Sequence, residues 1–198
     1  MGVRFVALGD SFTIGTSVEE AGRWPNQLIA RHPNLGLELV ANLGVNGFTS
    51  RDVIEVELPR LDALHPELLS VLIGVNDVVQ RVPEATYRSN IEVILDEAVR
   101  RVGAGRTFVV TTPDYTVTPA GADYGDPATQ SAAIRRNNAV NVELAAARGI
   151  SVIDIHDISL QAAHDPSLVA DDGLHPSAVQ YARWVERIAP VVETLLRI

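Results

Sequence analysis

Five short, mainly apolar runs recur along the chain, and segments with helical spacing separate them. The runs cover residues 3–8, 37–40, 68–73, 106–111 and 150–155. Strands that are apolar along most of their length are typical of a parallel sheet, because helices cover both of its faces. The alternation of strands and helices therefore predicts an α/β fold with a five-stranded parallel sheet.

The segments between these runs place apolar residues three and four positions apart, which is the spacing of a helix with one buried face. Trp24 and Trp184 lie on such faces and are expected in the core. Pro59 and Gly149 mark expected helix ends. The expected helices cover residues 19–31, 51–58, 83–101, 128–148, about 157–164, and 176–196.

Length and composition favour one globular domain spanning residues 1–198. A net charge of −9, with no Lys/Arg cluster, makes nucleic acid and anionic membrane surfaces poor partners. The chain has no cysteine, which excludes a disulfide framework and a thiol nucleophile but leaves the redox compartment open. The first apolar run is too short for a signal peptide, so a cytoplasmic location is the default expectation, with a removed leader left open. No run approaches the roughly 18 apolar residues of a membrane span.

The first apolar run stops at Gly9-Asp10-Ser11. Catalytic groups in open α/β sheets sit at the carboxyl ends of strands, and a serine there can act as a nucleophile when a base removes its proton. Asp172 and His175, three residues apart near the other end of the chain, can supply the base and the carboxylate that orients it. The alternatives are that residues 9–11 form an ordinary turn, that Asp172 caps the last helix and that His175 is a surface residue.

A nucleophilic serine also needs hydrogen-bond donors for the oxyanion of the tetrahedral intermediate. Three candidates follow strands at the same edge of the sheet: the backbone N–H groups of Ser11 and Gly47, and the side-chain amide of Asn76. Gly44 is a weaker candidate for the glycine position. A simple turn at Gly47 and an Asx turn or helix cap at Asn76 remain open as alternatives.

Four blocks of the sequence resemble those of the SGNH (GDSL-type) hydrolases: Gly9-Asp10-Ser11, residues 42–50 with Gly47, Gly74-Val75-Asn76-Asp77, and Asp172-Gly173-Leu174-His175-Pro176. They occur in the family's order and extend over nearly the whole chain. The resemblance implies a three-layer α/β/α flavodoxin-like fold with sheet order 2-1-3-4-5. It also implies a triad of Ser11, His175 and Asp172, with Gly47 and Asn76 completing the oxyanion hole.

The reactions of this family are hydrolyses of carboxylic esters, thioesters and O-acetyl groups on sugars, generally without a metal or cofactor. The resemblance therefore implies a small-molecule ester substrate, such as an acetylated sugar or an acyl lipid, and an acyl-enzyme intermediate. We expect a serine hydrolase for small acyl or O-acetyl groups. A longer-chain lipase or thioesterase of the same fold, and a catalytically silent flavodoxin-like binding module, remain as alternatives.

The connection over residues 112–127 is long for an α/β unit, and such loops often carry function. Tyr115 and Tyr124 within it are candidates to line an acyl or sugar pocket. A surface loop that packs on itself is the alternative, and the sequence leaves open whether the loop is a mobile lid.

Three other enzyme classes fit the sequence less well. A metallophosphoesterase needs an Asp-x-His near the first strand, whereas this chain has one only at Asp154-Ile155-His156. A classical α/β-hydrolase needs Gly-x-Ser-x-Gly, and position 13 is Thr13. A phosphatase with an aspartyl nucleophile usually shows Asp-x-Asp after the first strand, where this chain has Asp10-Ser11-Phe12.

Overall fold

One parallel sheet lies at the centre of the computed structural model, which describes residues 2–197. Its strand order is β2-β1-β3-β4-β5, and every neighbouring pair is parallel, which confirms the expected topology. The strands are β1 (Val3–Gly9), β2 (Leu37–Asn42), β3 (Leu68–Leu72), β4 (Thr107–Val110) and β5 (Ser151–Ile153).

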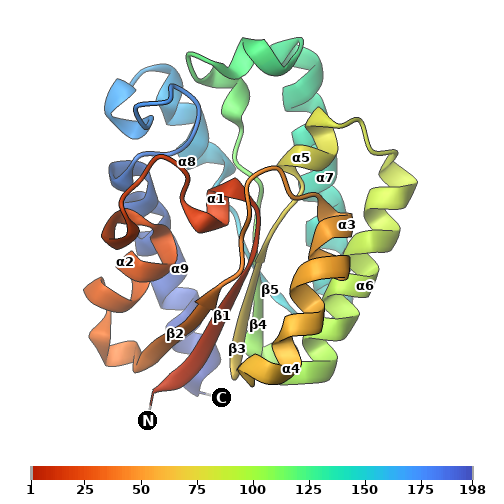
Figure 1. Cartoon of the computed structure of the whole chain (residues 1–198), viewed down its shortest axis with the longest axis vertical. Coiled ribbons are helices and arrows are strands. Elements are labelled where there is room, and N and C mark those ends of the chain that lie inside the picture. The colour runs from red at the N-terminus through yellow and green to blue at the C-terminus, as the bar shows by residue number, and fades with distance from the viewer. Residues whose placement is uncertain (1, 198) are drawn as a thin grey trace.

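Helices cover both faces of the sheet, as the apolar strands require (Figure 1). The helices α2 and α9 pack on one face, and α3, α4, α6 and α7 pack on the other. The helix bounds are α1 (Ser11–Ile14), α2 (Trp24–Arg31), α3 (Ser50–Asp52), α4 (Leu61–Leu64), α5 (Val75–Val79), α6 (Glu84–Val102), α7 (Pro127–Ala147), α8 (His156–Leu160) and α9 (Ala178–Arg197).

Two apolar cores follow from this three-layer arrangement. On the α2/α9 face, Phe5 packs against Trp24 and Phe108, each with ring centroids 6.1 Å apart, and Trp184 packs edge-on against Tyr181. Both tryptophans are fully buried, as predicted. On the other face, α6 and the segment ending in α4 bury their apolar side chains against β1, β3 and β4. Every residue of β3 is buried, so the third apolar run is the central strand.

Several predicted helix bounds are wrong, for local reasons. The segment 19–31 is not one helix: Arg23 is extended between a 3-10 turn (Glu20–Gly22) and α2. Pro59 does not end the segment that begins at residue 51, because it lies in the first turn of a 3-10 helix (Leu58–Arg60), where no backbone N–H is needed. The chain passes from α3 through a π-helical turn (Val53–Glu57) and this 3-10 turn into α4.

The carboxyl ends of the strands meet at the edge shown at the top of Figure 1. Two short helices, α1 and α5, begin there within two or three residues of the ends of β1 and β3. Neither helix was predicted, because four or five residues are too few to show a helical repeat. Within residues 2–197, no helix has the length and apolar character needed to cross a bilayer.

Candidate active site

The first candidate side chain, Ser11, is the first residue of α1, two residues beyond the end of β1. Asp10 caps this helix, since its carboxylate accepts the Phe12 backbone N–H at 2.9 Å. Gly9 makes the sharp exit from the strand with φ +153°, and a Cβ there would lie 2.2 Å from the Leu72 carbonyl oxygen. The turn therefore requires glycine at position 9, and it holds Ser11 at the edge of the sheet.

A cavity of about 280 Å³ opens at this edge, and nearly all of the predicted site residues line it. Ser11, Gly47, Asn76 and His175 line it. The first three follow β1, β2 and β3, and His175 comes from the loop before α9. The remaining lining residues are Phe12, Asn46, Val75, Val79, Tyr115, Tyr124 and Leu174. Of the predicted triad, only Asp172 does not line the cavity; it contacts His175 from behind.

His175 and Asp172 form a short, fixed pair. The ring Nδ1 lies 2.6 Å from Asp172 Oδ2, and the backbone N–H groups of Leu174 and His175 donate to Asp172 Oδ1 at 2.9 and 3.0 Å. Although partial burial opposes ionisation, hydrogen bonds from Ser17, His175 and these backbone groups hold the pKa of Asp172 well below its usual range. An ionised Asp172 accepts a hydrogen bond from the ring Nδ1–H, which keeps the proton on Nδ1 and leaves Nε2 as the basic nitrogen.

The candidate nucleophile Ser11 and the candidate base His175 line the same cavity without a direct hydrogen bond. Among the hydrogen bonds of the described part of the chain, none joins the Ser11 hydroxyl to the His175 ring. The Phe12 ring packs against the imidazole, with centroids 5.2 Å apart, and 12% of the His175 side chain is exposed. Catalytic hydrogen bonds of this kind are often long before substrate binds.

The candidate oxyanion donors come from three segments: α1 for Ser11, α5 for Asn76 and the loop after β2 for Gly47. Gly47 lies in a turn and has φ +81°. Its backbone N–H and the backbone N–H of Ser11 have no acceptor within residues 2–197. The Asn76 amide donates to the Phe48 carbonyl at 2.9 Å, which uses one of its two N–H bonds. Buried Asp77 accepts both the N–H and the hydroxyl of Ser50, at 2.9 and 2.6 Å. These bonds join the Gly47 loop to α5.

Gly44 occupies a different place from Gly47. It packs against α1, where a Cβ would lie 2.6 Å from the Asp10 carbonyl oxygen and 2.7 Å from the Ile14 nitrogen. Gly44 does not line the cavity, whereas Gly47 does. The structure therefore gives Gly44 a packing position beneath the turn that carries Ser11.

Tyr115 and Tyr124 form one wall of the cavity, with rings edge to face and centroids 5.8 Å apart. Tyr115 is buried and its hydroxyl bonds to Gln130 of α7, while 44% of Tyr124 is exposed. The carboxylate of buried Asp114 accepts from the Thr116 N–H and from the hydroxyls of Thr116 and Ser131. The tyrosine loop is thus tied to α7.

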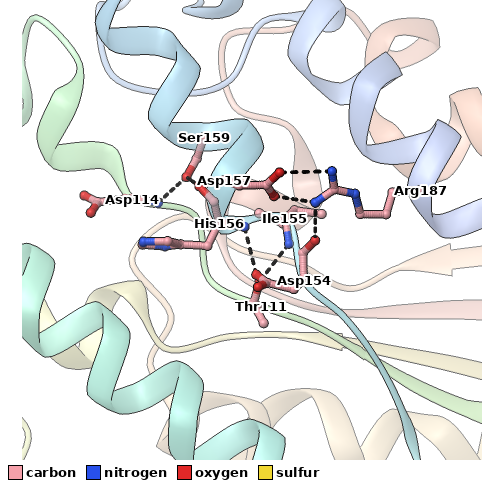
Figure 2. A network of polar contacts seen from close by, with 8 residues as sticks. All are labelled: Thr111, Asp114, Asp154, Ile155, His156, Asp157, Ser159 and Arg187. Atoms are coloured by element: carbon pink, nitrogen blue, oxygen red, sulfur yellow. Dashed lines mark hydrogen bonds and ion pairs between the residues drawn. The ribbon is translucent and has the colours of Figure 1, made fainter.

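A polar network also anchors the base of this loop (Figure 2). The Asp114 N–H donates to Ser159 Oγ of α8 at 2.8 Å, and the Thr111 hydroxyl donates to Asp154 at 2.8 Å. Arg187 of α9 donates to the Asp154 carbonyl and pairs with Asp157. The network joins the ends of β4 and β5 to two helices.

Two buried carboxyl groups lie below the turn that carries Ser11. Glu57, on the π-helical turn, accepts the Gly9 N–H at 2.9 Å, and burial raises its pKa to about 9. Burial also raises the pKa of Asp10, to about 8. No three His, Asp or Glu side chains within the described residues come together as ligands for a metal ion.

Sequence reasoning missed three contributors to the site. Phe12 and Gln130 are ordinary core and helix residues in the sequence, and only the fold brings them to His175 and Tyr115. Ser17, whose hydroxyl donates to Asp172 Oδ2 at 2.7 Å, lies 155 residues from its partner, and no spacing signals that contact.

The chain is similar to one protein family and to several solved structures. A model of the GDSL-like lipase/acylhydrolase family matches residues 7–183. No curated protein matches the sequence.

The similar solved structures include an α/β hydrolase enzyme from the metagenome of Lake Arreo, Spain. It is 20% identical, with TM-score 0.74 over 98% of this chain and 96% of that one. An acetylxylan esterase from Geobacillus stearothermophilus is 18% identical, with TM-score 0.77 over 97% and 94%. The protein TesA is 20% identical, with TM-score 0.73 over 97% and 99%. At these identities the likeness shows the shared fold.

Proposed function

The chain belongs to the GDSL-like lipase/acylhydrolase family, whose members hydrolyse esters, and we propose that it is a serine hydrolase for esters of small acyl or O-acetyl groups. The observation that carries the proposal is the single cavity lined by Ser11, His175, Gly47 and Asn76. A nucleophile, a base and donors for an oxyanion in one cavity are the set that acyl transfer requires.

In the proposed reaction the Ser11 oxygen attacks the ester carbonyl while His175 Nε2 takes the hydroxyl proton. The ring then gives this proton to the departing alkoxide, and an acyl-enzyme remains. Water repeats the sequence and releases the acid. Asp172 keeps the Nδ1 proton in place and stabilises the imidazolium, which the 2.6 Å contact and the low pKa of Asp172 support.

The negative charge that develops on the carbonyl oxygen needs fixed donors. The unbonded N–H groups of Ser11 and Gly47 and the second N–H of Asn76 are available for it. Each such donor contributes on the order of 100-fold or more to the rate. The bonds from Asp77 to Ser50 and from Asn76 to Phe48 support this role, because they preorganise the donors before substrate arrives.

The size of the cavity supports a small acyl group. About 280 Å³ lies below the usual range for drug-sized ligands, roughly 300–1,000 Å³. Val75, Val79 and Leu174 give part of the lining an apolar character, and the tyrosine pair closes one side. Tyr115 and Tyr124 are therefore proposed to contact the substrate.

The acetylxylan esterase with a similar fold lends further support. Its catalytic mutants replace a serine, an aspartate and a histidine, the last two three positions apart. Ser11, Asp172 and His175 are the same residue types, and the aspartate and histidine have the same spacing.

The test is hydrolysis of p-nitrophenyl esters from acetate upward by the wild type and by Ser11→Ala. We expect acetate or propionate to give the highest kcat/KM and Ser11→Ala to lose at least about 1,000-fold in rate. Ser167→Ala removes a hydroxyl from an exposed turn outside the cavity and serves as the matched control.

Each other outcome points to a named alternative. A maximum at long chains would favour a lipase or thioesterase. Unchanged activity in Ser11→Ala would overturn the nucleophile assignment. Binding of an ester to both proteins without turnover, across model esters and acetylated sugars, would indicate a binding module.

A further inference from the structure

The turn that follows α1 touches two other loops of the site. The turn covers residues 15–18 and is closed by a hydrogen bond from the Val18 N–H to the Gly15 carbonyl at 3.3 Å. The Thr16 hydroxyl bonds to Asn46, the neighbour of Gly47, and the Ser17 hydroxyl donates to Asp172 Oδ2 at 2.7 Å. The segment that carries Ser11 is thus linked directly to both of the other loops.

The backbone at Ser17 is in a conformation that serine rarely adopts. Its φ is +61°, and within residues 2–197 only His65 and Arg81 are other non-glycine residues with positive φ. A left-handed backbone is unfavourable for a residue with a Cβ, and glycine adopts it freely. In this fold, the residue with this unfavourable backbone conformation is the one whose hydroxyl contacts Asp172.

The hydrogen bonds of Asp172 show what Ser17 adds. Oδ1 accepts the backbone N–H groups of Leu174 and His175, and Oδ2 lies 2.6 Å from the His175 ring. All three of these donors belong to the same short loop as Asp172. Ser17 is the one hydrogen-bond donor to this carboxylate from another element of the described chain.

We propose that Ser17 is a positioning residue that holds Asp172 Oδ2 in place for His175 and couples the nucleophile segment to the Asp172–His175 loop. This inference rests on the proposed function, in which Asp172 orients the base. Two donors on one carboxylate oxygen fix the plane of the carboxylate, so the Nδ1 bond keeps its direction through the reaction. Because Ser17 does not line the cavity, it acts through Asp172.

Loss of the hydroxyl has two expected effects. The carboxylate becomes freer to rotate, which lowers kcat. Without the Ser17 donor, more of the carboxylate's negative charge acts on the ring, and this favours the protonated imidazole. The acid limb of the kcat/KM profile therefore moves to higher pH. Because 30% of the Asp172 side chain is exposed, water replaces part of the bond, and we expect a loss of about three- to tenfold.

Other charged groups surround this contact and stay unchanged in the test. Asp171, Glu19, Glu20 and Arg23 line the open groove beside Ser17. Asp10 and Tyr181 lie on the buried side. None of them donates a hydrogen bond to Asp172 within residues 2–197.

Three variants separate positioning from stability. Ser17→Ala removes the hydroxyl. Ser17→Gly also removes it, and it relieves the strain of the positive φ at this position. Ser17→Thr keeps the hydroxyl but puts a β-branched residue at positive φ, which lowers the melting temperature. We expect both hydroxyl-free variants to lose activity and the threonine variant to keep most of it. Ser167→Ala, which removes the hydroxyl that bonds to Asp165, is the matched control.

The deciding measurements are the pH profile of kcat/KM and the low-field proton resonance of His175 Nδ1–H. The resonance should shift in Ser17→Ala and Ser17→Gly and stay in place in Ser17→Thr and Ser167→Ala. An unmoved resonance with an unmoved acid limb in the hydroxyl-free variants overturns the inference. The resonance does not depend on turnover, so it decides the role of Ser17 even where Ser11→Ala shows that the proposed reaction is wrong.

Discussion

The side-chain amide of Asn76 donates a hydrogen bond to the carbonyl oxygen of Phe48 at 2.9 Å. Phe48 directly follows Gly47, so the bond joins two of the proposed oxyanion donors through one residue. The Asn76 amide has a second N–H, and the residue lines the cavity. The orientation of the amide is thus set before any substrate binds, which is the condition for electrostatic stabilisation of a transition state.

The first prediction is that Asn76→Ala lowers kcat by about 100- to 1,000-fold with a much smaller change in KM. The reason is that the donor acts on charge that develops only in the transition state. Steady-state kinetics on p-nitrophenyl acetate measure both constants. Gln80→Ala is the control, because its amide donates to the Gly47 carbonyl from outside the cavity. Equal losses in the two variants would mean that loop support, rather than donation to the oxyanion, accounts for the effect.

The second prediction concerns Gly44. In Gly44→Ala the new Cβ would lie 2.6 Å from the Asp10 carbonyl and 2.7 Å from the Ile14 nitrogen, so α1 must move. We expect a loss of about 1–3 kcal/mol in the free energy of unfolding, together with lower activity, because α1 carries Ser11. Urea unfolding measures the first effect. Gly105→Ala, where the Cβ would meet nothing within 4 Å, should leave both quantities nearly unchanged.

The third prediction concerns the acyl end of the substrate. Tyr124→Ala removes the exposed half of the tyrosine wall, while Tyr124→Phe keeps the ring against Tyr115. The ratio of kcat/KM for hexanoate to that for acetate should rise about tenfold in the alanine variant and stay near the wild-type value in the phenylalanine variant. A ratio that is the same in all three proteins would place the acyl group elsewhere in the cavity.

The architecture was predictable because it depends on features that the sequence repeats. Buried parallel strands need continuous apolar runs, and their carboxyl ends must meet at one edge. Ser11, Gly47 and Asn76 each follow such a run, so their approach in space follows from topology alone. Asp172 and His175 are three residues apart, and a short loop is enough to bring them together.

The contacts that fix these groups were not predictable in the same way. The Ser17–Asp172 bond joins positions 155 residues apart and depends on a single residue with positive φ. Glu57 belongs to the expected helix 51–58, and no pattern in the sequence predicts that a π-helical turn brings it under Gly9. Such turns depend on the packing around them and leave no periodic pattern in the sequence.

The last prediction uses this buried glutamate. Glu57 Oε2 accepts the Gly9 N–H, while Oε1 has no partner within the described residues, and the side chain is fully buried. Burial, with the nearby Asp10 adding to it, raises the pKa of Glu57 from 4.5 to about 9. The folded protein therefore keeps a proton that the unfolded chain has already released. Between about pH 4.5 and 9 this difference makes the folded state less stable as pH rises, and outside that window Glu57 contributes no slope.

Glu57→Gln cannot titrate, so we expect the fall in unfolding free energy between pH 5 and 8 to become shallower, by at most about 1.4 kcal/mol per pH unit. Urea unfolding at several pH values measures the slope. Burial also raises the pKa of Asp10, to about 8, so Asp10 should preserve part of the pH dependence of stability in this variant. Glu55→Gln changes an exposed carboxyl on the same turn, which pairs with Arg51, and should leave the slope as it is. If Glu57→Gln and Glu55→Gln gave the same slope as the wild type, Glu57 would have to be ionised in the folded protein, and its buried charge would need a partner that binds Oε1.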